Sequence, residues 1–358
     1  MPRRVAATIL TSAVDTADRA FFLAAYDLFL RGEPGTAEQV AASLPQYFGR
    51  EETRPIERAS ALARLGYVRR AGGRRARAGQ LRPTRKGRKA YEKEVEDYYI
   101  ESGIAESAAS PAFRELCKQR QGIEPCQHGT VTDRQLEALV RVAHESAARA
   151  GSRPRILDLG CGCGELGLHL LRRAGSRLVG VDVSASALTH ARTVAAGLAI
   201  QTAEFVREDL ERVSLGGDTF DVVMAVDALY WVEDLDGLLG RVLSRLSPAG
   251  AVVVLQADFE NSRRGPTTLP WEGTVVGAGI EALLEGRDDV SVEVEDFTEE
   301  ERRIWAHTPA LAEAFSRQFR KEGRYFLLRN LQEEAKELEK TVARAPGARY
   351  LYVLTRRD

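Results

Sequence analysis

The sequence predicts an α/β protein, with a doubly wound and mainly parallel sheet that follows a mainly helical N-terminal domain. Three observations support this prediction. From residue 155 onward, short apolar runs bounded by glycine alternate with helical patterns, as in parallel strands joined by helices. Residues 1–100 instead show helical periodicity and one short hairpin. At 358 residues, the chain is long enough for two domains.

Residues 1–100 are expected to form three helices, a two-stranded hairpin and one more helix. Apolar runs, a capping box of Thr36 and Gln39, and breaks at glycine and proline define these elements. They are helices over 21–30, from Thr36 and over 53–66, strands at 67–69 and near Leu81, and a helix from Thr84. The phrases LARLGYVRR and LRPTRKGRKAY are similar to the third helix and wing of many bacterial regulators, so this part resembles a winged-helix domain.

Charge is unevenly distributed along this domain, although the net charge of the chain is only −1. Residues 61–90 contain no acid and many arginines, which is the electrostatic footprint of nucleic-acid binding. The acidic stretch at 92–97 follows directly and could neutralise this patch. Nucleic acid therefore stays an alternative partner.

Residues 101–131 are rich in Ser, Ala and Gly and are expected to be a linker or lid with a short helix over 112–119. Cys117, Cys126 and His128 fall in this segment and invite comparison with a metal site. Their spacing matches no usual zinc pattern and a fourth ligand is missing, so no metal is expected.

Cysteine usage and hydropathy predict a cytoplasmic protein. Cys161 and Cys163 lie in a glycine turn, where a disulfide would be strained, so reduced thiols are expected. No apolar run approaches the ~20 residues of a membrane-spanning helix. Asp15 closes off the short apolar stretch at the N-terminus, so no signal peptide is expected.

Residues 155–182 hold the most informative pattern. Ile156–Leu159 has the character of a buried strand, 165–174 of a helix and 178–181 of a second strand. This order is the nucleotide-binding half of a doubly wound sheet. Asp182 ends the second strand, where an acid can accept hydrogen bonds from both hydroxyls of a ribose.

The turn between these elements reads Asp158-Leu159-Gly160-Cys161-Gly162-Cys163-Gly164, or D-x-G-x-G-x-G. A dinucleotide site has G-x-G-x-x-G instead. An acid beside the glycines suits a ligand with a cationic end, such as an amino acid, better than a pyrophosphate. The stretch closely resembles the first motif of class I methyltransferases that depend on S-adenosylmethionine (SAM). The resemblance implies SAM as cofactor, S-adenosylhomocysteine as product, and a Rossmann-like sheet of seven strands whose last strand is antiparallel.

The resemblance also implies which residues contact the cofactor. Asp209 matches the acid that accepts a hydrogen bond from the adenine amino group, and Leu210 could supply a neighbouring backbone N–H. The expected contacts are Asp158, Gly160, Cys161, Gly162, Gly164, Asp182, Val183, Asp209, Leu210 and Val226.

The methyltransferase domain is expected to span residues 132–358. Its other elements are helices over 132–150, 185–196, 235–246, 275–284, 309–319 and 327–343, and strands over 203–207, 220–226, 251–255, 290–294 and 350–354. An insertion at about 298–345 resembles that of the sterol- and sugar-type small-molecule methyltransferases, in which it helps to form the acceptor pocket.

Methyl transfer from SAM requires the protein mainly to position the reactants. The sulfonium makes the methyl group electrophilic, so aligning and desolvating the reactants supplies much of the catalysis, and no catalytic residue is compulsory. An acceptor with a high pKa would need a general base. The candidates for this base are Asp227, Glu260 and His307, and Tyr230 is a further catalytic candidate. Tyr230 and Trp231 could instead be pocket walls, core residues or residues that stack on the substrate.

The sequence therefore predicts a cytoplasmic transferase that methylates O, N or C of a small molecule, with secondary metabolism as its setting. In the resembled family, an N-terminal domain of this kind serves dimerisation and substrate enclosure, and the apolar helix at 21–30 suggests a homodimer. Two alternatives stay open. One is a nucleic-acid-directed methyltransferase, or a regulator fused to one, that uses Arg74, Arg75 and Arg77. The other is a SAM-binding enzyme that transfers no methyl group, such as a cyclase or a transferase of another group of SAM.

Overall fold

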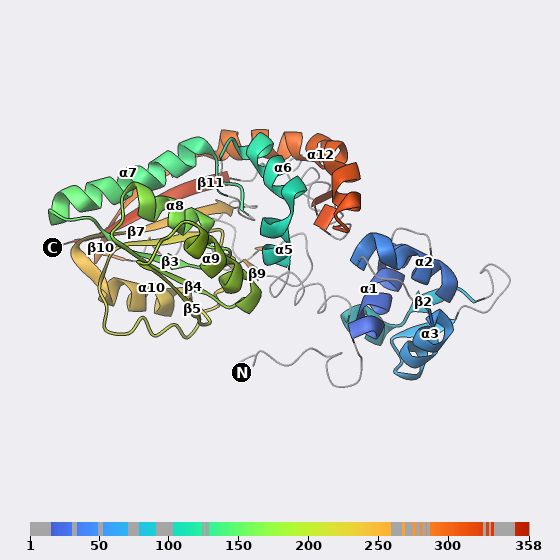
Figure 1. Cartoon of the computed structure of the whole chain (residues 1–358). Helices are drawn as coiled ribbons and strands as arrows, with labels where there is room; N and C mark the ends of the chain where they lie inside the picture. Colours follow the sequence, from blue (N-terminus) through green and yellow to red (C-terminus); the bar gives the residue numbers. More distant parts are fainter. Residues whose placement is uncertain are drawn as a thin grey trace. The chain divides into compact units, whose positions relative to one another are not determined.

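The computed structural model divides the chain into two compact units, residues 1–100 with 316–329, and residues 101–315 with 330–358 (Figure 1). The residues that the structure describes are 16–30, 34–48, 53–70, 79–90, 103–123, 125, 129–258, 267–268, 275–276, 280, 284, 287–324, 327–328, 331–332 and 348–357. Each unit has a hydrophobic core of its own.

The first unit contains the predicted three helices and antiparallel hairpin. They are α1 (Thr16–Leu30), α2 (Ala37–Phe48), α3 (Pro55–Arg64), β1 (Val68–Arg70) and β2 (Leu81–Pro83). The capping box at the start of α2 forms, since Thr36 N donates to Gln39 Oε1 at 2.8 Å. Phe22, Tyr26 and Leu62 meet in the core of the unit. Assignment to the winged-helix class stays a prediction, and Arg74, Arg75 and Arg77 lie outside the described residues.

The second unit is built on a seven-stranded sheet with the order β10-β11-β7-β6-β3-β4-β5. Its strands are β3 (Arg155–Leu159), β4 (Arg177–Asp182), β5 (Ala203–Arg207), β6 (Phe220–Val226), β7 (Leu246–Asp258), β10 (Val290–Asp296) and β11 (Ala348–Arg356). Strands β3 to β7 are parallel, and β11 runs antiparallel to both β7 and β10. The predicted sheet, with its antiparallel last strand, is confirmed.

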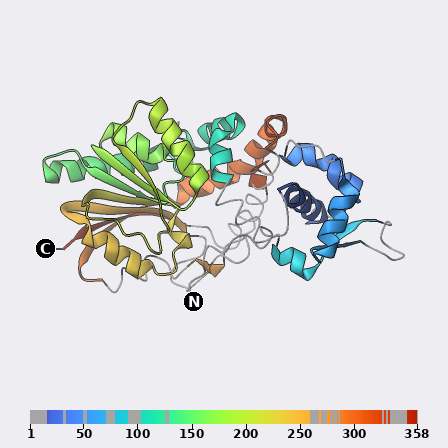
Figure 2. The ribbon, with the colours of Figure 1, turned by 60° about the horizontal axis from the view of Figure 1, so that its bottom comes forward.

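Helices cover both faces of this sheet. They are α7 (Asp133–Ala150), α8 (Glu165–Arg173), α9 (Ala185–Gly197) and α10 (Leu235–Ser244). Because side chains alternate along a strand, Ile156 packs with α7, α8 and α9, whereas its neighbour Leu157 packs with α10. Figure 2 shows green helices and the gold helix α10 on opposite faces. This layering leaves the carboxyl ends of the parallel strands as the edge where a ligand binds.

Two helices occupy most of the segment that the sequence assigns to a linker or lid. They are α5 (Ile104–Ala109) and α6 (Pro111–Gln121). Ser110 begins α6, because its hydroxyl accepts a hydrogen bond from Phe113 N at 3.1 Å and Pro111 stands at the first helical position. This segment belongs to the second unit.

The region before the last strand differs from the sequence prediction at two places. Helix α12 (Thr298–Lys321) begins at Thr298, where Asp296 Oδ1 accepts from Thr298 N at 2.8 Å, and Pro309 lies inside it instead of starting it. The helix predicted from Val275 is wrong at its start, since β9 (Val275–Val276) pairs with β8 (Thr267–Thr268). Both short strands consist of β-branched residues, which favour extended backbone. Of the helix predicted over 327–343, residues 327–328 and 331–332 are helical and the rest lies outside the described residues.

Candidate functional site

The glycine turn joins β3 to α8 at the ligand edge of the sheet. Gly160 and Gly164 have φ values of +71° and +73°, which favour glycine. There is also no room for a larger residue at either position. A Cβ on Gly160 would lie 2.4 Å from the Cβ of Ala228, and one on Gly164 would lie 2.8 Å from Phe205 Cε1. The amides of Gly160 and Cys161 donate to Val181 O at 2.8 and 3.0 Å, so the turn is fixed to β4.

Asp182 is held in a defined orientation at the end of β4. Its Oδ2 accepts a hydrogen bond from Gly162 N and its Oδ1 accepts one from Ser184 N, each at 2.8 Å. Burial raises the pKa of Asp182, and the backbone donors of Ser184 and Gly162 lower it in part. Each carboxylate oxygen still has acceptor capacity for a ligand hydroxyl.

Asp158 lies on β3 just before the turn and is buried. Burial, followed by the charge of Asp182, raises the pKa of Asp158 to about 8. A carboxyl in this setting gains from a cationic ligand, because an opposite charge favours its ionised form.

Helix α5 packs on the glycine turn at Cys163. Cys163 Sγ lies 3.5 Å from Ile104 O, and Cys163 packs with Ala108 and Ala187. Burial raises the pKa of Cys163 to about 12, and it also raises the pKa of Cys161. Both thiols are therefore neutral and act as packing groups, with no disulfide among the described cysteines.

The remaining predicted cofactor residues follow neighbouring strands at the same edge. Val183 comes after β4, Asp209 and Leu210 follow β5, and Val226 ends β6. Asp209 is exposed, and its Oδ1 accepts from Glu211 N at 3.1 Å. Leu210 packs on the core, and its carbonyl accepts from Arg241 Nη2 at 3.1 Å. The sheet thus brings the predicted cofactor residues to one edge.

Asp227 follows β6 and is engaged on both carboxylate oxygens. Arg349 Nη1 and Nη2 donate to Asp227 Oδ1 and Oδ2, each at 2.9 Å, and Arg349 is fully buried. The Tyr230 hydroxyl also donates to Asp227 Oδ1 at 3.1 Å, and it accepts from Ala257 N at 2.8 Å. Burial and the charge of Asp227 raise the pKa of Tyr230 well above its usual value, so Tyr230 stays neutral. The catalytic roles expected for Asp227 and Tyr230 stay predictions, and this geometry favours positioning over proton transfer.

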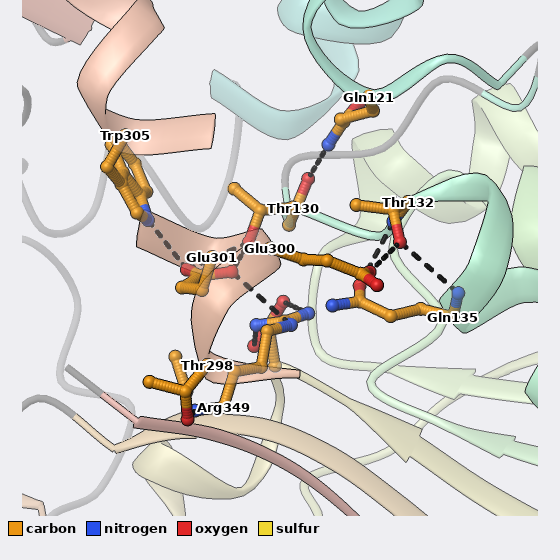
Figure 3. Close-up of polar contacts among 12 residues, drawn as sticks. Gln121, Thr130, Thr132, Gln135, Thr298, Glu300, Glu301, Trp305 and Arg349 are labelled. Atoms are coloured by element: carbon orange, nitrogen blue, oxygen red, sulfur yellow. Dashed lines mark hydrogen bonds and ion pairs between the residues drawn. The ribbon is translucent and has the colours of Figure 1, made fainter. Parts of the chain in front are cut away.

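A second buried carboxylate extends this network (Figure 3). Glu301 Oε2 lies 3.5 Å from Arg349 Nε and accepts from the Thr130 hydroxyl at 2.9 Å, while Trp305 Nε1 donates to Glu301 Oε1 at 2.6 Å. Burial raises the pKa of Glu301. Sequence reasoning missed Arg349, Glu301 and Thr130, because Arg349 meets its partner Asp227 across 122 residues and no local pattern marks it.

The other candidates lie apart from this cluster or outside the described residues. His307 is exposed on α12, with Nδ1 2.7 Å from Arg303 O of its own helix. Glu260, the Trp231 side chain, Cys126 and His128 are outside the described residues. Where the chain is described, no three His, Cys, Asp or Glu side chains group as a metal site would require. In the same part of the chain, no helix is long and apolar enough to cross a membrane.

Comparison with known proteins agrees with this geometry. A family model described as a methyltransferase domain matches residues 156–250. The methyltransferase phqN of Penicillium fellutanum is 29% identical over 156 residues, which are 42% of this chain and 48% of that protein. The trans-aconitate 2-methyltransferase of Paracidovorax citrulli is 33% identical over 145 residues, which are 38% of this chain and 54% of that protein. The chain thus spans about half the length of these two relatives.

Solved structures show the same fold. Phosphoethanolamine N-methyltransferase 2 of Haemonchus contortus, in complex with SAM, superposes with a TM-score of 0.57 at 14% identity, over 86% of this chain and 76% of that one. The segment 156–250 thus resembles a methyltransferase domain, and the second unit shares the fold of the solved structure.

Proposed function

We propose that the whole chain is an enzyme that transfers a methyl group from SAM to O, N or C of a small molecule. The observation that carries the proposal is the glycine turn, in which Gly162 N fixes Asp182 while buried Asp158 lies beside it. This set offers one buried acid to a cationic group and one oriented acid to a pair of hydroxyls. SAM carries both groups, in its amino acid and in its ribose.

The roles of the residues follow from their chemistry. Asp158 would hold the ammonium group, Asp182 the ribose hydroxyls, and Asp209 with Leu210 N–H the adenine. SAM supplies an electrophilic methyl group when bound, and the protein's part is to align the acceptor and exclude water. The buried network at Asp227 would fix the acceptor side of the site, with no proton transfer required of it.

A small acceptor is favoured over nucleic acid by the insertion before β11, whose helix α12 contributes Glu301 and Trp305 to that network. Two relatives that match part of the chain are named as methyltransferases, one of them for trans-aconitate. The domain at residues 1–100 would serve dimerisation and substrate enclosure. A cytoplasmic location and a place in secondary metabolism complete the proposal.

Mass spectrometry of small molecules bound to the purified protein, with calorimetric titration of SAM, tests the proposal. Co-purified SAM or S-adenosylhomocysteine is expected. Asp182→Ala should weaken SAM binding by about tenfold or more, because it removes both side-chain oxygens that would accept hydrogen bonds from the ribose. Asp218→Ala, which removes an exposed partner of Arg177, should leave binding unchanged.

Circular dichroism of the Asp182→Ala variant separates lost binding from lost folding. Unchanged affinity in that variant, or no binding by the wild type, would refute the assignment. Product analysis addresses the alternative without methyl transfer, because only methyl transfer converts SAM into S-adenosylhomocysteine.

A further inference from the structure

A buried arginine without a counter-ion lies at the end of α6. Arg120 is 9% exposed, and its Nε and Nη2 atoms have no hydrogen-bond partner. Among the described residues, no carboxylate pairs with it. Arg120 Cζ lies 5.8 Å from the centroid of the Trp305 ring.

Burying the unpaired donors of Arg120 costs free energy. Buried N–H groups of a guanidinium that have no acceptor cost free energy, because the water they lose is not replaced by another partner. Glu301, which bonds the same Trp305 side chain, already interacts with Arg349 and Thr130. A bound anion would relieve this cost.

The position of Arg120 links it to the ligand edge of the sheet. The next residue, Gln121, donates from its side-chain amide to Gly129 O at 2.5 Å (Figure 3). A Cβ on Gly129 would lie 2.4 Å from Asp227 Oδ2, so Gly129 packs directly on the network that follows β6. Ala228, the residue after Asp227, lies against Gly160 of the glycine turn. Arg120 is therefore connected, through Gln121 and Gly129, to the network at Asp227 that the proposed function assigns to the acceptor side.

The free atoms also indicate which anion fits. Nε and Nη2 form one edge of the guanidinium, and their two N–H groups match the two oxygens of a single carboxylate. One unaccompanied cation balances a carboxylate monoanion, whereas a phosphate dianion would call for more positive charge. We propose that the methyl acceptor carries a carboxylate and that Arg120 binds it through Nε and Nη2, which makes Arg120 a specificity-determining residue. This inference rests on the proposed function.

Formate is a suitable probe, because it is the smallest carboxylate and needs no cofactor. The melting temperature of the full-length protein is measured as formate replaces chloride at constant ionic strength, for the wild type and for Arg120→Met. Without formate, Arg120→Met should melt at a higher temperature, since it removes an unpaired buried charge. Formate should stabilise the wild type, and its apparent affinity should fall about tenfold or more in the variant.

Arg134→Met is the control for loss of a paired arginine, whose side chain is 63% exposed. Arg134 also lies over an aromatic ring, at 4.9 Å from the Phe297 centroid, but Glu300 already pairs with it at 2.9 Å. This variant should gain no stability and should keep the formate response. Three results would each overturn the inference. They are a lower melting temperature for Arg120→Met than for the wild type, an equal formate response in the wild type and Arg120→Met, and a wild type whose melting temperature does not respond to formate. Failure of S-adenosylhomocysteine to bind the wild type would count against the proposed function alone.

Discussion

At the scale of single residues, Asp158 shows how burial sets the chemistry of the cofactor site. With a pKa of about 8, this carboxyl is mostly protonated at neutral pH unless a cation lies beside it. The unfolded chain releases that proton near pH 4, so this group makes the folded state less stable as pH rises from about 4 to about 8. A ligand ammonium would reverse this effect by favouring the carboxylate.

The affinity for S-adenosylhomocysteine should therefore rise between pH 6 and pH 8. Binding to the ammonium requires the ionised carboxyl, so each pH unit below 8 should weaken binding by up to about tenfold. Calorimetric titration at pH 6, 7 and 8 measures this dependence. Asp158→Asn should bind more weakly and show little change over the same range. A wild type whose affinity is constant between pH 6 and pH 8 would contradict the role given to Asp158.

At the scale of elements, the glycine turn depends on both conformation and space. Gly160→Ala should cost about 3 kcal/mol of unfolding free energy, because it combines a positive φ with a methyl group 2.4 Å from Ala228 Cβ. Gly216→Ala shares the positive φ, +55°, but meets no atom within 4 Å, so it should cost about 1 kcal/mol. Urea denaturation followed by circular dichroism compares the two. Equal costs would show that crowding at Ala228 does not constrain the turn.

The sheet elements could be predicted from the sequence because their signal is local. Strands β5 and β6 match the predicted ranges, since each is a short run bounded by turn residues. The start of helix α12 is harder to predict from the sequence. Pro309 suggests a helix start but lies inside the helix, whose first turn carries Glu299, Glu300 and Glu301. An acidic first turn is itself a start signal, which the proline obscured.

The cofactor residues could be predicted for the same reason, since D-x-G-x-G-x-G and Asp182 are close in the sequence. The residues on the acceptor side could not be predicted from the sequence. Arg120, Glu301 and Arg349 come from α6, α12 and β11, and only the folded chain shows that Arg349 is paired and Arg120 is not. Nothing in the residues beside them distinguishes either arginine from the many exposed ones.

At the scale of the whole molecule, the buried network joins segments that are distant in the chain. Arg349 on β11 connects Asp227, which follows β6, to Glu301 on α12, and Glu301 connects in turn to Thr130 before α7. The ion pair lies where these segments converge. A buried ion pair generally stabilises a protein little more than apolar side chains of similar volume would. Removing one partner is different, because it leaves an uncompensated buried charge.

Arg349→Met should therefore destabilise the protein by about 3–5 kcal/mol, because Asp227 and Glu301 would lose their common cation. Arg177→Met removes an arginine that also pairs with two acids, Glu204 and Asp218, but at exposed positions, so it should cost at most about 1 kcal/mol. Adding Asp227→Asn to Arg349→Met should recover part of the loss, since it removes one of the unpaired charges. Urea denaturation of the four proteins gives these differences. If the double variant were no more stable than Arg349→Met, the loss would come from packing of the long side chain and not from stranded charge.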